Sequence, residues 1–161
     1  MGRDCRILFV CLGNICRSPL AEAIMRHQAG AARVAVSVDS AGTGDWHVGS
    51  PPDRRAIAVA AEHALDITGL RARQIDRADF ARFDHIVALD RANLRDIHSI
   101  MPPDATPFLS LLFDHVPGRE GQDVADPYLK GDKPAFQKAW DDISSGVEGL
   151  LAELSRAESV R

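Results

Sequence analysis

Residues 7–19 read Ile-Leu-Phe-Val-Cys-Leu-Gly-Asn-Ile-Cys-Arg-Ser-Pro, and this stretch decides the fold. Ile7–Val10 is an unbroken apolar run, which is typical of a buried parallel strand. Pro19 suits the first turn of a helix, because the N–H that it lacks would have no partner there. A Cys-x5-Arg loop from Cys11 to Arg17 joins the two. The stretch therefore predicts a strand, a tight loop and a helix in direct succession.

This loop has the composition of a phosphate-binding site with a sulfur nucleophile. A thiol at Cys11, where loop amides and a helix N-terminus converge, has its anionic form favoured. The same amides can bind phosphate oxygens, and Gly13 lets the backbone approach a ligand or adopt a positive φ. The planar side chain of Arg17 can donate two parallel hydrogen bonds to those oxygens. The predicted phosphate-binding residues are Leu12, Gly13, Asn14, Ile15, Cys16 and Arg17.

The rest of the chain alternates between strand-like and helical segments. Strands are expected at 6–11, 34–39, 84–89 and 105–109, and helices at 17–29, 53–65, 76–82, 90–97 and 134–154. In the helix at 53–65, Ala56, Ile57, Ala60 and Ala64 are expected to face inward. Such alternation predicts an α/β fold of three layers, with a central parallel sheet of about four strands between helices. Ligands bind such sheets beyond the strand C-termini, where Cys11 falls and where the loops 40–52 and 114–132 could reach.

Length and composition favour one compact cytoplasmic domain over residues 1–161. The chain is 45% hydrophobic and 26% charged, as in ordinary globular proteins. A net charge of −4 argues against nucleic-acid binding, and no apolar run approaches a membrane span or a signal peptide. All three cysteines lie within the first sixteen residues, which does not suit a secreted disulfide framework.

In the loop motif Cys11-Leu-Gly-Asn-Ile-Cys-Arg-Ser18 the chain resembles the low-molecular-weight protein tyrosine phosphatases. The resemblance runs the length of the chain. It includes the stretches Asp-Ser-Ala-Gly-Thr at 39–43, Asp-Trp at 45–46, Ala-Arg-Gln at 72–74, Asn-Leu-Arg-Asp at 93–96 and Asp-Pro-Tyr at 126–128. A second motif more than a hundred residues from the first, in the expected order, is unlikely to arise by chance.

The resemblance implies hydrolysis of phosphotyrosine and small aryl phosphates through a cysteinyl-phosphate (thiophosphate) intermediate. Cys11 would be the nucleophile, and Arg17 with the loop amides would stabilise the transferring phosphoryl group. Asp126 would be the acid for the leaving oxygen and then the base for water. Its neighbour Pro127 restricts the backbone of Asp126 and stiffens the loop. Asp123 is the nearest substitute for this acid.

Further residues have supporting roles by the same resemblance. Ser18 would donate its hydroxyl to the thiolate, although a Ser here could also cap the helix. Asn14 and Ser40 would hold the loop in shape. Trp46 and Tyr128 would form an aromatic rim suited to a phenyl ring, although Trp46 could also be a partly buried anchor of its loop. The position after Tyr128, often aromatic in the family, is Leu129 in this chain.

Two roles are open for Cys16. The resemblance implies a reversible disulfide between Cys16 and Cys11 that protects the nucleophile from over-oxidation, hence redox regulation. A buried, small apolar role is the alternative.

Many family members carry a His two residues before Ala-Arg-Gln that binds the loop Asn, whereas this chain has Leu70. Asn14 must therefore be held differently.

The expected partners follow from the same resemblance: a phosphotyrosine-containing protein as substrate and inorganic phosphate or other oxyanions as inhibitors. No cofactor, metal, nucleic acid or membrane is implied, and a monomer is expected. Three rival functions remain. A protein-arginine phosphatase would have Thr where Ile15 stands, and an arsenate reductase needs cysteines beyond Cys16, of which the chain has none. A non-catalytic phosphotyrosine-binding module would not need a thiol and an acid together.

Overall fold

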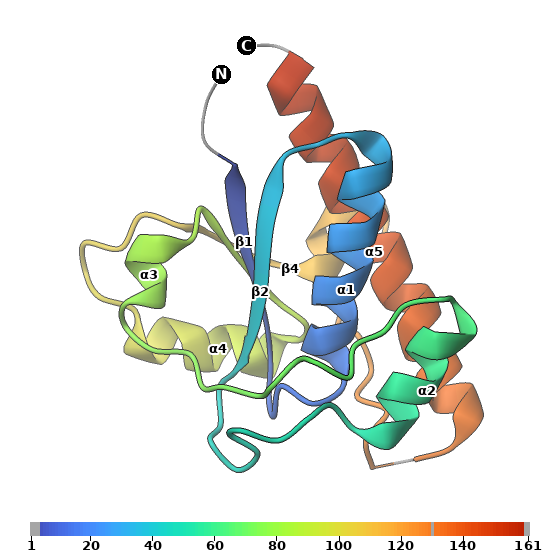
Figure 1. The fold of residues 1–161 in the computed structure, drawn as a ribbon. Coiled ribbons are helices and arrows are strands. Elements are labelled where there is room, and N and C mark those ends of the chain that lie inside the picture. The colour runs from blue at the N-terminus through green and yellow to red at the C-terminus, as the bar shows by residue number, and fades with distance from the viewer. Residues whose placement is uncertain (1–3, 130, 160–161) are drawn as a thin grey trace.

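A computed structural model describes residues 4–129 and 131–159, which form an α/β fold of three layers (Figure 1). The central sheet is entirely parallel and has the strand order β2-β1-β3-β4. Its strands are β1 (Cys5–Cys11), β2 (Val36–Gly42), β3 (His85–Ala88) and β4 (Phe108–Leu111). The predicted class, with four parallel strands and the Cys-x5-Arg loop at the C-terminal end of the first, is confirmed.

Helices cover both faces of the sheet because β1 and β3 are apolar on both sides. Ile7 and Phe9 pack with α1 (Arg17–Ala32), α2 (Arg54–Glu62) and α5 (Lys133–Ser159). Leu8 and Val10 pack with α3 (Asp79–Arg82) and α4 (Arg91–Ile100) on the other face. A short 3-10 helix, η1 (Leu112–His115), follows β4 and packs with the first group. The odd and even residues of one strand thus belong to two separate cores.

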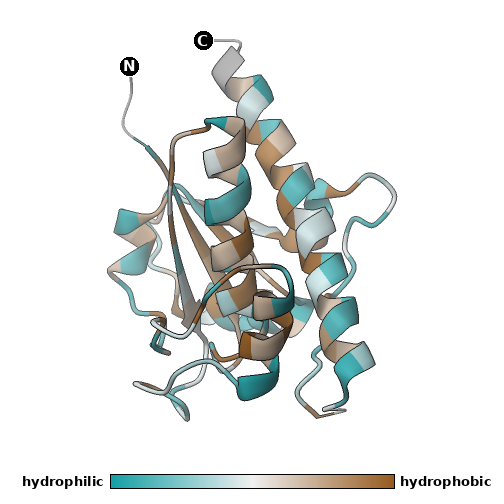
Figure 2. Cartoon of the chain, turned by 45° about the vertical axis from the view of Figure 1, so that its right-hand side comes forward, coloured by the Kyte–Doolittle hydropathy of each residue, from teal (hydrophilic) through white to brown (hydrophobic). Residues whose placement is uncertain are grey.

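The long C-terminal helix α5 buries the stripe that its sequence predicts. Its buried apolar residues include Phe136, Trp140, Ile143, Val147, Leu150 and Leu151. Figure 2 shows the strands coloured brown, while α1 and α5 alternate between brown and teal turns. Each of these helices thus carries both apolar and polar residues, as a layer between a sheet and solvent requires.

The second strand differs from its prediction: it spans Val36–Gly42 rather than 34–39. The helix before it ends at Ala32 and is capped by Arg33, whose left-handed φ of 57° lets Val34 donate its N–H to the carbonyl of Ala29. This closing turn delays entry into the sheet. Residues 40–42, expected in a loop, instead pair with the end of β1. The pairing brings Ser40 and Gly42 to the Cys-x5-Arg loop.

Two smaller expectations were also wrong. The fourth strand spans Phe108–Leu111 instead of 105–109, since a turn at residues 102–105 precedes it. Ala64 is exposed rather than inward, because α2 ends at Glu62 and Ala64 has a φ of 61°. The inward face of α2 is formed by Ala56, Ala60 and Val59, the last of which was not foreseen, and the partly buried Ile57 also packs against the core, as expected.

Candidate active site

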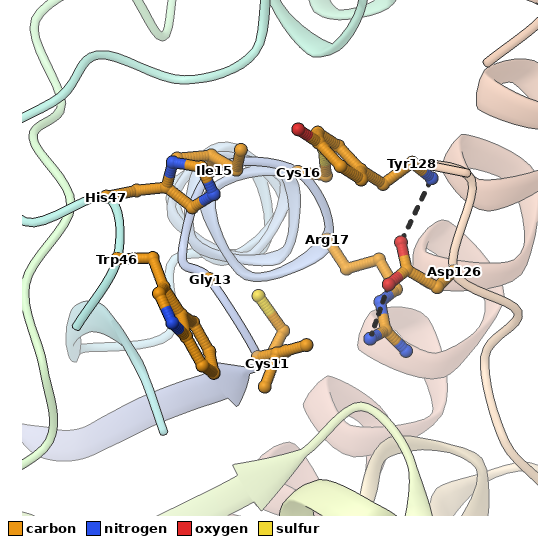
Figure 3. Close-up of a pocket in the computed structure, with 10 residues that line it drawn as sticks. Cys11, Gly13, Ile15, Cys16, Arg17, Trp46, His47, Asp126 and Tyr128 are labelled. Carbon is orange, nitrogen blue, oxygen red and sulfur yellow. Dashed lines mark hydrogen bonds and ion pairs between the residues drawn. The ribbon is translucent and has the colours of Figure 1, made fainter. Parts of the chain in front are cut away.

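The Cys-x5-Arg loop lies at the C-terminal edge of the sheet, between β1 and α1 (Figure 3). Cys11 is 3% exposed, and its Sγ accepts a hydrogen bond from the backbone N–H of Asn14 at 3.3 Å. The Ser18 hydroxyl lies 2.9 Å from the same sulfur. Cys16, at the N-cap of α1, provides no side-chain cap, so the first amides of the helix are available to an anion.

Asn14 shapes this loop from within. Its φ of 58° lies in the left-handed region, which Asn tolerates better than most residues. The side-chain Nδ2 donates to the hydroxyls of Ser18 at 2.8 Å and Ser40 at 3.0 Å. Its Oδ1 accepts a hydrogen bond from the backbone N–H of Arg73 at 3.0 Å. The backbone N–H of Arg73 thus holds Asn14 in this chain, which has Leu70 where many family members have a His.

Gly42, the last residue of β2, allows the closest approach of backbone to the loop. The next two amides, those of Thr43 and Gly44, donate to the carbonyls of Cys11 and Leu12, each at 2.9 Å. A Cβ on Gly42 would lie only 2.7 Å from the Leu12 carbonyl oxygen. Only Gly fits here, and the first half of the loop is therefore held against β2 by main-chain contacts.

The guanidinium of Arg17 is fixed from behind and faces the sulfur. Its Nη1 donates to the Asp90 carboxylate at 2.8 Å and to the Val124 carbonyl at 2.7 Å. Nη2 lies 3.6 Å from Oδ2 of Asp126. Burial of Arg17 works to lower its pKa, but the negative charges of Cys11, Asp126 and Asp90 outweigh burial and raise the pKa. The side chain is a permanent, oriented cation beside the thiol.

The structure places Asp126 at the mouth of the same pocket, across from Trp46 (Figure 3). Its side chain is 39% exposed, and Oδ1 accepts the Tyr128 backbone N–H at 3.0 Å. This local turn aims the second oxygen at Arg17. The loop is tied to the sheet at Val124, whose N–H donates to the carbonyl of Leu89 at 2.9 Å.

Asp123, the substitute considered for the acid, is engaged elsewhere. Its carboxylate accepts hydrogen bonds from the backbone and side chain of Arg91, at 2.8 and 3.1 Å. The hydrogen bond from the Arg91 side chain is the main reason that the pKa of Asp123 lies below its usual value. Asp123 does not line the pocket that contains Cys11.

That pocket has a volume of about 90 Å³ and an aromatic rim. Trp46 is 70% exposed, although its ring lies against Gly44 of its own loop, and Tyr128 is 42% exposed. His47, which sequence reasoning missed, lies beside Ile15 on the same rim. The other lining residues are Leu12, Gly13, Cys16, Arg17 and Asp126.

Arg55, also missed, connects the rim to the loop. Its guanidinium lies 5.4 Å from the ring centre of Tyr128 and 4.8 Å from that of Phe136. Asp53 holds it through Nε and Nη2 at 2.9 and 2.7 Å. The backbone N–H of Asp53 donates in turn to the carbonyl of Ile15 at 2.8 Å. The position of Tyr128 is thus coupled to the Cys-x5-Arg loop through the start of α2.

Cys16 is a thiol that is 4% exposed and packs with the core. Burial is the main cause that raises its pKa, and the carboxylate of Asp53 adds to the effect. Cys16 is therefore protonated near neutral pH. It differs in this respect from a thiol suited to direct attack on phosphorus.

Within residues 4–129 and 131–159, no cluster of three or more His, Cys, Asp or Glu side chains is arranged to hold a metal ion. Among the same residues, no helix has the length and apolar character needed to cross a membrane.

Comparison with known proteins identifies relatives over nearly the whole chain. The family described as low molecular weight phosphotyrosine protein phosphatase matches residues 6–160. The low molecular weight protein-tyrosine-phosphatase YfkJ of Bacillus subtilis is 36% identical over 156 residues, which cover 96% of this chain and 98% of that protein.

Solved structures agree. The crystal structure of YfkJ from Bacillus subtilis superposes with a TM-score of 0.90 at 37% identity, covering 97% of this chain and 98% of that one. The crystal structure of DARP, a drosophila arginine phosphatase, superposes with a TM-score of 0.86 at 34% identity, covering 91% and 96%.

Proposed function

Because the chain belongs to the low molecular weight phosphotyrosine protein phosphatase family and is thus a phosphatase of proteins, we propose that it hydrolyses phosphotyrosine through a cysteinyl-phosphate intermediate. One observation carries the proposal. The sulfur of Cys11, the guanidinium of Arg17 and the carboxyl of Asp126 line one small pocket, with Trp46 and Tyr128 at its mouth.

In the first step the Cys11 thiolate attacks phosphorus. The S–P bond forms as the bond from phosphorus to the ester oxygen breaks, and Asp126 gives its proton to that oxygen. Arg17 and the loop amides stabilise the charge on the three equatorial oxygens. Arg17 is suited to this role because Asp90 and Val124 hold its position before substrate arrives.

In the second step water replaces sulfur. The Asp126 carboxylate takes a proton from the water as its oxygen attacks phosphorus, and the S–P bond breaks. The released thiolate is stabilised by the Ser18 hydroxyl, which lies 2.9 Å away, and by the Asn14 amide. The products are tyrosine and inorganic phosphate, and the enzyme returns to its starting protonation state.

The rim supports an aryl substrate. Trp46 and Tyr128 provide flat surfaces on which a phenyl ring can stack, and Ile15 adds an apolar wall. The proposed substrate is a phosphotyrosine-containing protein, and phosphate or other oxyanions would compete for the same amides. We place the activity in the cytoplasm, in a single monomeric domain over residues 1–161 that uses no cofactor.

A protein-arginine phosphatase is the second candidate, since DARP, whose title names an arginine phosphatase, has the same fold at 34% identity. Ile15 favours the aryl ester, because its side chain lines the pocket with carbon atoms only. A phosphoguanidino group would leave its polar N–H groups against this wall without partners.

Redox control is part of the proposal. Oxidation of Cys11 by peroxide would give a sulfenic acid, and Cys16 would displace water from it to form a disulfide. Cys16 must lose its proton to do so. Its raised pKa implies that capture is slow near neutral pH and faster in alkali.

The test compares phosphotyrosine, phosphoarginine and phosphoserine in one peptide frame, with wild type and Cys11→Ser. We expect phosphotyrosine to have the highest kcat/KM by at least about tenfold, and rapid mixing with an aryl phosphate to show a burst of phenol. Cys11→Ser should bind phosphate but show no burst, whereas Cys16→Ser should retain it. A preference for phosphoarginine would select the second candidate, and a burst in Cys11→Ser would reject the nucleophile.

A further inference from the structure

A buried carboxylate in α1 ends a chain of hydrogen bonds that begins at the proposed nucleophile. Glu22 is 4% exposed. Its Oε1 accepts the Ser40 hydroxyl at 2.7 Å, and its Oε2 accepts Nη2 of Arg26 at 2.7 Å. Glu22 does not line the pocket and has no place in the two chemical steps. A buried charge away from a site calls for a physical reason.

The reason lies in the number of hydrogens that each group can donate. An ionised carboxylate only accepts, so the one hydroxyl hydrogen of Ser40 must point to Glu22. The oxygen of Ser40 then accepts from Asn14, whose Nδ2 lies 3.0 Å away. The amide of Asn14 cannot turn over without bringing its NH₂ group against the backbone N–H of Arg73.

The second hydrogen of the Asn14 amide goes to the oxygen of Ser18 at 2.8 Å. Ser18 must therefore direct its own hydrogen away from Asn14. The sulfur of Cys11 lies 2.9 Å away, whereas the alternative acceptor, the carbonyl of Ala41, lies 3.5 Å away. Ser18 is left as a donor to sulfur.

We propose that Glu22 is a positioning residue that, together with the backbone N–H of Arg73, fixes the direction of the Ser40–Asn14–Ser18 chain, so that Ser18 donates to Cys11. This inference rests on Cys11 being the nucleophile. In Glu22→Gln the side-chain oxygen should face Arg26 and the NH₂ group should face Ser40. Ser40 must then donate to Asn14 and favours a reversed amide, against the cost of losing the hydrogen bond from Arg73. Ser18 could then donate to the same amide oxygen instead of the sulfur, which would lose a stabilising partner of its anionic form.

The proposed role and the loss of a negative charge predict opposite effects of Glu22→Gln on the ionisation of Cys11. Removing a negative charge near a thiol should ease its ionisation. Reversing the chain should hinder it. In Glu22→Gln we therefore expect alkylation of Cys11 by iodoacetamide to require more alkaline solution, with the midpoint of its pH profile higher by roughly one pH unit. A midpoint that is unchanged or lower would overturn the proposal.

Three further variants distinguish an effect on the direction of the hydrogen bonds from effects on folding and on charge. Arg26→Ala leaves the carboxylate able to accept from Ser40, so its midpoint should stay close to that of wild type. In a Ser18→Ala background, Glu22→Gln should cause little further change, because the last donor is already missing. If Glu22→Gln does not fold, Ser40→Ala cuts the same chain and should move the midpoint in the same direction. An additive effect in the double variant would refute the chain.

A second, independent inference concerns a groove of about 770 Å³ that adjoins the pocket. Leu12 and Trp46 line both cavities. Beyond them the groove runs between the end of α4, at Ile100 and Met101, and the segment before α3, at Ile75. Leu12 and Ile100 are 43% and 38% exposed and give this part of the groove apolar surface. The remaining lining includes the charged side chains Asp76, Arg77 and Asp96.

The geometry points to this groove as the seat of an aliphatic substrate side chain within three residues of the phosphotyrosine, if the proposed function holds. A substrate whose phenyl ring lies against Trp46 must pass its adjoining main chain over the rim. On the other side of Trp46 and Leu12 lies this groove, with its apolar surface. Burial of a leucine there would favour such peptides.

The test measures kcat/KM for phosphotyrosine peptides that carry Leu or Gly at each flanking position, with p-nitrophenyl phosphate as reference. We expect Leu to be preferred over Gly at one position by roughly fivefold, and Ile100→Ala should reduce this preference. Leu129→Ala is the control, because Leu129 is 91% exposed and lies outside the groove, next to Tyr128. It should leave the preference unchanged. Both variants should hydrolyse p-nitrophenyl phosphate as wild type does.

Two outcomes would overturn the groove proposal: no aliphatic preference at any position, or a concentration-dependent dimer that Ile100→Ala abolishes. The dimer would assign the groove to a second copy of the chain. Loss of p-nitrophenyl phosphate hydrolysis in the wild type would instead reject the proposed function.

Discussion

The role of Asp126 as proton donor is tested most sharply by Asp126→Asn. The amide can keep the hydrogen bond that Oδ1 accepts from Tyr128 at 3.0 Å, so the loop should keep its shape while the proton is lost. Positioned proton transfer contributes about 10²–10⁴ in rate. We therefore expect kcat for phenyl phosphate to fall by that factor. For p-nitrophenyl phosphate, whose leaving group needs little protonation, the loss in the first step should be below about tenfold.

The matched control is Asp123→Asn. Asp123 is held by Arg91 outside the pocket, in an exposed ion pair that contributes little to stability. Its variant should hydrolyse both substrates as wild type does. Burst kinetics over a series of substituted phenyl phosphates give the dependence of the first step on the leaving group. The reasoning is refuted if that dependence steepens in Asp123→Asn but not in Asp126→Asn.

Three other expectations concern the cation, the second thiol and pH. Arg17→Lys should lower kcat/KM by at least about a hundredfold, because an ammonium cannot replace a planar guanidinium that Asp90 and Val124 hold in place. Activity near wild type would contradict this expectation. After peroxide and then thiol reductant, Cys16→Ser should recover less activity than wild type, and equal recovery would leave Cys16 a packing role. Burial lowers the pKa of His85, so unfolding takes up a proton as the pH falls below 6.5. The urea midpoint should thus fall between about pH 7.5 and about pH 5, and fall less in His85→Asn.

The parts of the fold that could be predicted are those that local sequence patterns determine. The apolar run Ile7–Val10 and the spacing of Cys11 and Arg17 predict a strand, a loop and a helix, and all three are found. The start of β2 could not be predicted, because it depends on the left-handed turn at Arg33, a position that the sequence does not mark with Gly or Asn.

The site divides in a similar way. Asp90 could have been placed beside Arg17, since it lies two residues after β3, whose end is at the same sheet edge. Glu22 has no such signal. Its position in a helix next to Arg26 resembles an ordinary surface ion pair, and only the packing of α1 on β2 turns it toward Ser40. The Val124 carbonyl is a main-chain group, which no side-chain pattern can reveal.

The contact between Arg17 and Asp126 has a consequence for product release. The guanidinium already has a carboxyl group of the chain's own beside it, with Nη2 and Oδ2 3.6 Å apart. Under the proposed function an entering phosphate group competes with this carboxyl oxygen for the guanidinium, and the measured affinity is the difference between two attractions. After hydrolysis the same oxygen would compete with the product phosphate and hasten its departure. A chain without this internal competitor would hold phosphate more tightly and would turn over more slowly for that reason as well.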